Sequence, residues 1–151
     1  MSEMQFADRR DAGRRLAAEL LSLAQERPIV VALPRGGVPV AVEVAKALDA
    51  PLDILAVRER TVIVVDDGLA TGLSDLAAIR ALRKRGARRI VVAVPVGSRE
   101  SVAMLGEEAD QVLCLMIPDR LYGVGLWYED FAPVSDEEVL ALLEQAGGGS
   151  D

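Results

Sequence analysis

Residues 62–72 read VIVVDDGLATG, a run of β-branched residues followed by two adjacent acids and a glycine-containing loop. A run that is apolar at every position is typical of a strand covered on both faces of a parallel sheet. Helical spacing begins at residue 74, so the loop joins a strand to a helix. The carboxylates of Asp66 and Asp67 repel each other, and a plain strand-to-helix turn does not need them. The stretch therefore predicts a functional loop at the end of a buried strand.

The pattern around this stretch alternates between strands and helices. The spacing predicts strands at 28–34, 52–57, 61–65, 90–96 and 111–117, and helices at 7–26, 38–48, 74–85, from 99 onward and at 136–145. Five almost wholly apolar strands separated by helices indicate a three-layer α/β/α fold with a five-stranded, mainly parallel sheet. We expect one domain over residues 1–146 and a disordered, glycine-rich tail over 147–151.

Composition excludes several classes of function. Seventeen basic residues against 24 acidic ones give a net charge of −7, which disfavours a nucleic-acid partner. The chain has no histidine, so Ser-His or Cys-His catalysis and the common zinc sites are excluded. Cys114 is the single cysteine and lies in an apolar run. No signal-like or membrane-length apolar stretch is present, so we expect a cytoplasmic protein without a membrane partner.

Two strand-to-helix loops could bind anions. Arg35, Gly36 and Gly37 follow the strand at 28–34, and paired glycines allow backbone N–H groups to approach a ligand closely. Residues 68–74 lead into the first turn of a helix, whose free N–H groups favour a phosphate. The alternative for the first loop is an ordinary turn, and for the second a helix cap made by Thr71 or Ser74. Two acids beside a phosphate cradle favour a ligand with both a phosphate and a diol, such as ribose 5-phosphate.

Both loops resemble motifs of the type I phosphoribosyltransferases. VIVVDDGLATGLS is similar to the phosphoribosyl-pyrophosphate motif of that family, and ALPRGGVPVA is similar to its pyrophosphate loop. The resemblance extends over most of the chain and is nearest to a bacterial subgroup of uncertain base specificity. It implies the strand order 2-1-3-4-5, in which both loops meet at the carboxyl edge of the sheet. It also implies a cis peptide inside the pyrophosphate loop, between Pro34 and Arg35.

The resemblance implies a function in nucleotide salvage and a role for each motif. The chain would transfer ribose 5-phosphate from phosphoribosyl pyrophosphate to a nitrogenous base, or act on the nucleoside monophosphate in reverse. The substrate would carry Mg²⁺, with no metal held by the protein alone. A homodimer is favoured. Asp66 and Asp67 would hold the ribose hydroxyls as catalytic acids, and the remaining contacts would come from Arg35, Gly36, Gly37 and Arg58 toward pyrophosphate and from Gly68, Leu69, Ala70, Thr71, Gly72, Leu73 and Ser74 toward the 5-phosphate.

The C-terminal segment 117–134 resembles the hood that covers the base in this family. Trp127 or Tyr128 would stack on the base, although aromatic residues near a last strand also commonly complete a core. Two residues depart from the family pattern. Ala70 replaces an aspartate that some purine enzymes use to protonate the base, and Asp75 adds a negative charge beside the phosphate cradle.

Only Arg58, Glu59 and Arg60 separate the predicted strands 52–57 and 61–65. Parallel neighbours need a crossover of about a dozen residues, and the family carries its flexible active-site loop here. Residues absent from the chain, a domain-swapped dimer or a rearranged sheet would each resolve the conflict, and we expect the first, a chain that lacks the flexible-loop segment. The short link leaves two functions open, an enzyme and a non-catalytic ribose-phosphate-binding module. A phospho-acceptor signalling domain is disfavoured, because no later strand ends in an acceptor aspartate.

Overall fold

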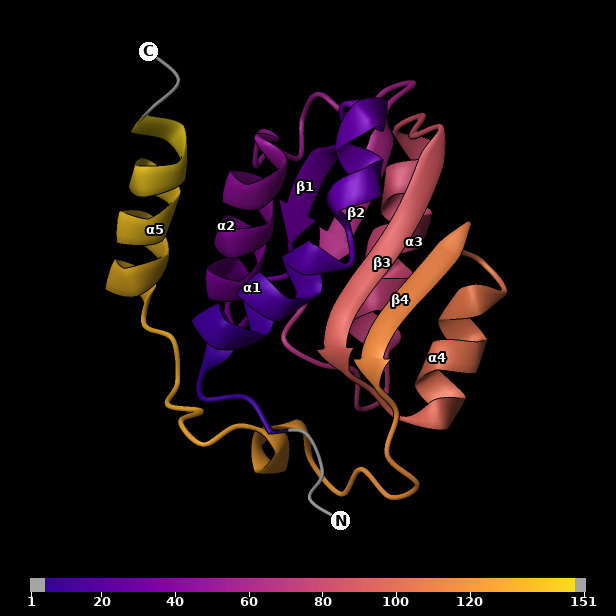
Figure 1. Cartoon of the computed structure of the whole chain (residues 1–151). Helices are drawn as coiled ribbons and strands as arrows, with labels where there is room; N and C mark the ends of the chain where they lie inside the picture. Colours follow the sequence, from indigo (N-terminus) through magenta and orange to yellow (C-terminus); the bar gives the residue numbers. More distant parts are fainter. Residues whose placement is uncertain (1–4, 149–151) are drawn as a thin grey trace.

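The computed structural model describes residues 5–148, which form a parallel sheet between two layers of helices (Figure 1). The sheet has four strands in the order β1-β2-β3-β4. Their bounds are β1 (Ile29–Ala32), β2 (Thr61–Val65), β3 (Arg89–Val96) and β4 (Gln111–Met116). All three pairings are parallel, so every strand ends at the same edge of the sheet. We call it the carboxyl edge.

Helices cover both faces of the sheet. Their bounds are α1 (Arg9–Ala18), α2 (Gly37–Leu48), α3 (Leu73–Lys84), α4 (Arg99–Gly106) and α5 (Asp136–Gly148), with short 3₁₀ helices at Leu21–Glu26 and Val124–Trp127. Helices α1 and α2 lie on one face and α3 and α4 on the other, while α5 lies beyond α2 (Figure 1). The predicted helix at 7–26 is therefore two elements, because α1 ends at Ala18 and a 3₁₀ helix follows.

The apolar strand sequences follow from burial on both faces. In β2, Ile63 and Val65 face the α1 and α2 layer, whereas Val62 and Val64 face the α3 and α4 layer, and all four are fully buried. Strand side chains alternate between faces, so two covered faces require an apolar residue at every position. This confirms the parallel α/β fold.

The prediction of a fifth strand at 52–57 is wrong. Only Leu52 pairs with the sheet, through a single parallel bridge to Val30 on the outer edge of β1. The amide of Val30 donates to Pro51 O at 2.9 Å, and the amide of Asp53 donates to Val30 O at 3.0 Å. Beyond this point the chain leaves the sheet edge, because it has to reach the start of β2 within a few residues.

The connection from α2 to β2, residues 49–60, reaches β2 without forming the predicted edge strand. Val57 is fully buried against the sheet face that α3 and α4 cover. The connection therefore passes from the outer edge of β1 to the opposite face from α2 and then enters β2. Residues 49–60 and α2 together form the crossover that two parallel neighbours require.

The C-terminal segment 117–135 runs along the carboxyl edge and contacts the start of the chain (Figure 1). Phe6 and Tyr128 form an isolated bridge, and their rings lie 5.5 Å apart. Helix α5 then packs on α2 and continues through Gly148. Residues 149–151 of the predicted tail lie outside the described residues. None of the helices within residues 5–148 has the length and apolarity that crossing a membrane requires.

Candidate ribose-phosphate site

The two predicted loops lie side by side at the carboxyl edge. The amide of Leu33, just after β1, donates to Val65 O at the end of β2 at 2.9 Å. The pairing of β1 with β2 then places residues 33–37 against Asp66 and Asp67. The structure therefore brings together the two motifs that the sequence separates by about thirty residues.

Two glycines allow this approach. A Cβ at Gly36 would overlap the carboxylate of Asp67, and a Cβ at Gly37 would lie 2.8 Å from Val65 O. Neither position can hold a side chain without displacing the acids or the backbone. The peptide between Pro34 and Arg35 is cis, as the resemblance implies.

Asp67 is held at the carboxyl edge by Arg9 and Tyr128. Its Oδ2 accepts a hydrogen bond and ion pair from Arg9 Nε at 3.0 Å, and both side chains are largely buried. Arg9 also donates to Ala132 O at 2.7 Å, and its guanidinium lies 4.0 Å from the ring centroid of Phe131. The hydroxyl of Tyr128 donates to Asp67 O at 2.6 Å. Sequence reasoning missed Arg9, because it is one of four arginines in α1 and no local pattern distinguishes it.

Asp66 has a different environment. Its Oδ1 accepts the amide of Asp67 at 2.8 Å, and its carboxyl group lies within hydrogen-bonding distance of Asp75 in the first turn of α3. Burial, then the negative charges of Asp75 and Asp67, raises the pKa of Asp66 well above its usual range. Burial also raises the pKa of Asp75, which is 2% exposed. The two adjacent acids of the motif are therefore not equivalent.

The loop from Gly68 to Ser74 forms the N-terminal approach to α3. Leu69 bridges Gly97 at the end of β3, and Ala70 O accepts hydroxyl groups from Ser98 at 3.0 Å and Ser101 at 2.6 Å. Gly72 caps α3 with φ 77°, a conformation that favours glycine. These contacts fix the loop to β3 and α4.

The side chains at the mouth of this loop are exposed. Thr71, Leu73 and Ser74 face solvent at the start of α3. Thr71 Oγ1 accepts the amide of Leu73 at 3.3 Å, while the N-cap position of α3 is Gly72, which has no side-chain cap hydrogen bond. The remaining first-turn amides and the positive end of the helix dipole are suited to an anion.

A hollow of about 530 Å³ lies beside the loop, between α4 and the start of the C-terminal segment. It is lined by Ala70, Thr71, Ser98, Glu100, Ser101, Met104, Asp119, Arg120, Leu121 and Tyr122. Its walls combine polar and apolar groups, which suits a planar heterocycle with hydrogen-bonding edges.

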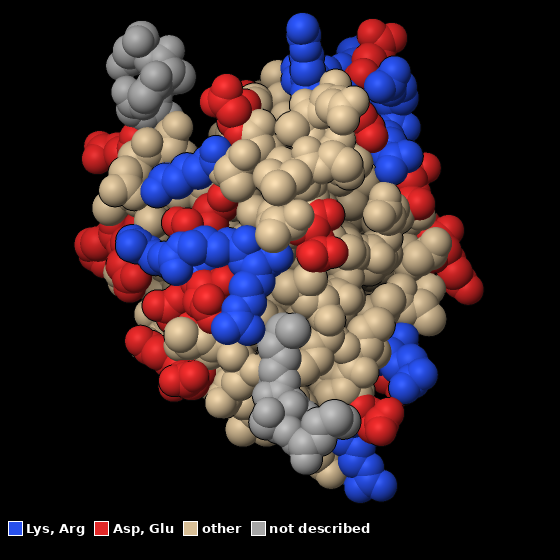
Figure 2. All heavy atoms as spheres, viewed as in Figure 1, with Lys and Arg blue, Asp and Glu red and all other residues tan. Residues whose placement is uncertain are grey.

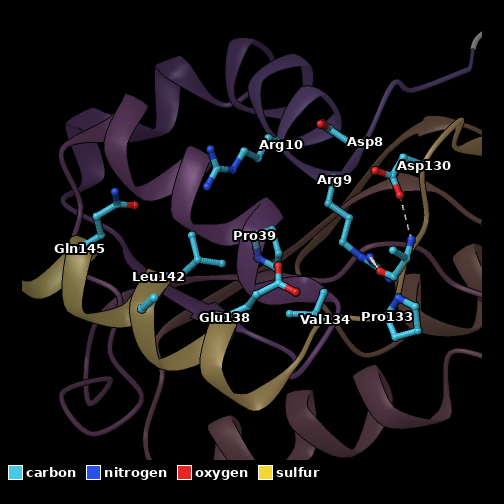
Figure 3. Close-up of a pocket in the computed structure, with 12 residues that line it drawn as sticks. Asp8, Arg9, Arg10, Pro39, Asp130, Pro133, Val134, Glu138, Leu142 and Gln145 are labelled. Atoms are coloured by element: carbon cyan, nitrogen blue, oxygen red, sulfur yellow. Dashed lines mark hydrogen bonds between the residues drawn. The ribbon is translucent and has the colours of Figure 1, made fainter.

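A second hollow, of about 330 Å³, lies between the N-terminus of α1 and α5 (Figure 3). Arg9 and Arg10 contribute from α1, and Glu138, Leu142 and Gln145 from α5. Arg9 reaches from this hollow to Asp67. On the face shown in Figure 2, basic side chains lie among acidic ones and form no continuous basic stripe.

The two aromatic residues that were predicted to stack on a base, Trp127 and Tyr128, differ in exposure. Tyr128 is 4% exposed and packs between Phe6 and Phe131, so its ring belongs to the core and is not open to a base. Burial, followed by the charge of Asp67, raises the pKa of its hydroxyl. Trp127 is partly exposed, and its Nε1 donates to Leu121 O at 3.0 Å. Trp127 is therefore the candidate that retains an open surface.

The two arginines that were predicted to contact pyrophosphate, Arg35 and Arg58, lie at different edges of the sheet. Arg35 lies at the carboxyl edge, where its guanidinium pairs with Asp136 in the first turn of α5 at 3.0 Å. Arg58 lies at the other edge of the sheet, against Gly86 between α3 and β3. The structure therefore does not bring Arg58 together with the two loops, because the length of β2 separates them.

A family model described as "phosphoribosyl transferase domain" matches residues 5–60 and 55–120 of this chain. The two matched stretches meet in the connection between α2 and β2. Among curated proteins, one of Mycobacterium tuberculosis H37Rv, provisionally named a phosphoribosyl transferase, is 34% identical over 207 aligned positions that cover 93% of this chain and 47% of that protein. The chain thus spans about half the length of this curated relative. Since the chain has 151 residues, at least 56 of the 207 positions have no counterpart in it.

Two solved structures are also similar to this chain. The TT1426 protein of Thermus thermophilus is 34% identical, with a TM-score of 0.88 over 95% of this chain and 99% of that chain. A purine phosphoribosyltransferase of Pyrococcus horikoshii is 20% identical, with a TM-score of 0.59 over 82% of this chain and 87% of that chain. At 20% identity, the second similarity concerns the fold alone.

Proposed function

The chain belongs to the phosphoribosyl transferase family, and on that premise we propose that it binds phosphoribosyl pyrophosphate and transfers ribose 5-phosphate to a nitrogenous base. The observation that carries this proposal is the meeting of two loops at one edge of the sheet. A glycine-rich turn after β1 lies against the acids after β2, and a helix N-terminus follows within a few residues. One ligand with a pyrophosphate, a diol and a 5-phosphate would contact all three.

Each part of the ligand would meet groups of matching chemistry. The amides opening α3, with Thr71 and Ser74, would hold the 5-phosphate. Asp66 and Asp67 would hold the ribose hydroxyls and face the positive charge that develops on the sugar as pyrophosphate leaves. Gly36 and Gly37 would present backbone N–H groups to pyrophosphate, with Arg35 as the nearby cation once it separates from Asp136.

Magnesium would enter with the substrate. Within residues 5–148, no three or more carboxylate, thiol or imidazole side chains are grouped so that they could hold a metal ion. A cation that arrives with the substrate would need few ligands from the protein. When bound, it would neutralise charge on the departing pyrophosphate.

The base would occupy the hollow between α4 and residues 119–122. This hollow adjoins Ala70 and Thr71, so a ligand whose phosphate lies at α3 could extend into it. Ala70 supplies no acid to a ring nitrogen, which favours a base that does not need protonation at that position. Trp127 remains the candidate for stacking.

A second candidate function is a ribose-phosphate-binding module without catalysis. The connection of residues 49–60 favours it, because all of that segment is used to reach β2 and none remains to close over the carboxyl edge. A site that stays open to water would bind its ligand but transfer ribose poorly.

Two measurements separate these functions. Titration calorimetry would measure binding of phosphoribosyl pyrophosphate with Mg²⁺, and pyrophosphate release would then be followed across a panel of purines and pyrimidines. Binding with release supports the transferase, whereas binding without release supports the module. A Gly36→Ala variant is the control, because its Cβ overlaps Asp67 and should abolish binding. Absence of binding in the wild-type protein would refute both functions.

A further inference from the structure

Asp75 is the most unusual charged residue near the site. It lies in the first turn of α3, is 2% exposed, and its Oδ2 has no hydrogen-bond donor among the described residues. An ionised carboxylate buried in this way is costly unless a donor or a positive charge reaches it. The neighbouring carboxyl group within hydrogen-bonding distance is that of Asp66.

No cation within residues 5–148 compensates this pair. Asp66 is approached from α3 by Asp75, from its own loop by Asp67, from α2 by the backbone at Gly37, and from the C-terminal segment by Tyr128. The nearby positive group is Arg9 of α1, and it pairs with Asp67. Asp75 is buried and Asp66 is partly buried, and without a cation the two neighbouring carboxylates disfavour being ionised together, because like charges at hydrogen-bonding distance repel strongly.

We propose that Asp66 and Asp75 share one proton, and that Asp75 is a positioning residue that keeps Asp66 uncharged at neutral pH. The proton supplies the donor that the pair lacks. Asp75 is the better place for the negative charge, because it lies at the positive end of the α3 dipole, so Asp66 carries the proton. The raised pKa of Asp66 agrees with this assignment.

The consequence for ligand binding rests on the proposed function. With its proton directed toward Asp75, a neutral Asp66 accepts from one ribose hydroxyl and Asp67 accepts from the other, so these two acids present one negative charge instead of two beside a phosphorylated ligand. The affinity for ribose 5-phosphate should therefore be independent of the ionisation of Asp66 until the pH is high enough to remove the shared proton.

Carbon-13 NMR of the aspartate carboxyl groups tests proton sharing without a ligand. In the wild-type protein, one aspartate should titrate above about pH 7, far from the usual value near 3.9. In Asp75→Asn the amide donates to an ionised Asp66, so this titration should move down by at least about 2 pH units. Glu137→Gln, an exposed first-turn acid of α5, is the matched control and should leave it unchanged.

The other outcomes overturn the proposal. Sharing is excluded if every wild-type aspartate titrates below about pH 6, or if the high titration persists in Asp75→Asn. Should Asp75→Asn fail to fold, Asp66→Asn replaces it, and a high titration that survives in that variant also excludes the pair.

The role toward ribose needs a second readout. Calorimetry with ribose 5-phosphate, performed on the wild type and Asp75→Asn from about pH 6 to 9, should show the pH dependence displaced to lower pH in the variant. The titration of the phosphate itself, near pH 6, is common to both proteins. Identical profiles would overturn the role of Asp75. If the wild type does not bind ribose 5-phosphate, the proposed function and the ribose role fail together, while NMR still decides whether the proton is shared.

Discussion

Asp66 and Asp67 are neighbours in the sequence, but their charges are balanced in different ways. Asp67 pairs with Arg9 across 58 positions of sequence, and Asp66 faces Asp75 in the helix that follows. Ion pairing neutralises one acid, and burial with a like charge favours a proton on the other. The repulsion that makes a doubled acid unusual after a strand is thereby removed before any ligand binds.

The first prediction concerns the pH dependence of stability. Below the usual aspartate pKa both the folded and unfolded chains hold a proton on Asp66, whereas above it only the folded chain does. Because the folded pKa is the higher one, the contribution of Asp66 to the free energy of unfolding falls as pH rises, by at most about 1.4 kcal/mol per pH unit. Urea unfolding of Asp66→Asn between about pH 5 and 9 should show a shallower decline than the wild type.

This prediction compares the slopes of the free energy of unfolding against pH. A loss of stability in Asp66→Asn that is the same at every pH therefore does not affect it. Glu137→Gln removes an exposed acid and should keep the wild-type slope. Equal slopes in the wild type and Asp66→Asn would show that Asp66 ionises normally in the folded protein.

The second prediction concerns space at the glycine-rich turn. Gly36 has an ordinary helical φ of −61°, so Gly36→Ala introduces no backbone strain, and its effect comes from overlap with Asp67. We expect a loss of about 1–3 kcal/mol in the free energy of unfolding as the Asp67 and Arg9 contact is displaced. Gly106→Ala is the control, because a Cβ there meets no atom within 4 Å and should be neutral or stabilising by up to about 1 kcal/mol. Equal effects in urea unfolding would contradict the close approach.

At the scale of elements, the connection from α2 to β2 determines how the sheet begins. Val57 is fully buried on the sheet face, whereas Leu55 is 76% exposed two residues earlier. Val57→Ala should therefore lower the free energy of unfolding by about 1–3 kcal/mol, and Leu55→Ala should change it by less than about 0.5 kcal/mol. Urea unfolding of both variants measures the difference. A larger effect at Leu55 would mean that the connection follows a different path.

This connection is also where prediction of elements from the sequence failed. The runs at 61–65 and 90–96 became strands because helices cover both of their faces. The run at 52–57 has a similar composition but lies at the sheet edge, in the segment that has to reach β2. The need for a short segment to reach β2 outweighs the local preference for a strand, so only Leu52 pairs with the sheet.

At the scale of the whole molecule, the site depends on contacts between distant segments. The two loops could be predicted because each follows a recognisable strand. Arg9 could not, because its partner Asp67 is set by how α1 crosses the carboxyl edge. Arg58 lies apart from the two loops for a related reason: the position of a residue near a motif in sequence does not fix the edge of the sheet on which it lies.

The last prediction concerns the coupling of the C-terminal segment to the sheet. Trp127 is the single tryptophan and lies in that segment, where its neighbour Tyr128 bonds to Asp67 O and packs on Phe6. Phe6, Val96 and Tyr128 form one apolar cluster from the start, the middle and the end of the chain. Such a cluster makes the segment part of the same cooperative unit as the sheet. Tryptophan fluorescence, which reports this segment, and far-ultraviolet circular dichroism, which reports all helices and strands, should therefore give coincident urea transitions. A fluorescence transition at lower urea would show that the segment detaches first, and the Tyr128 contact with Asp67 would then contribute little to the site.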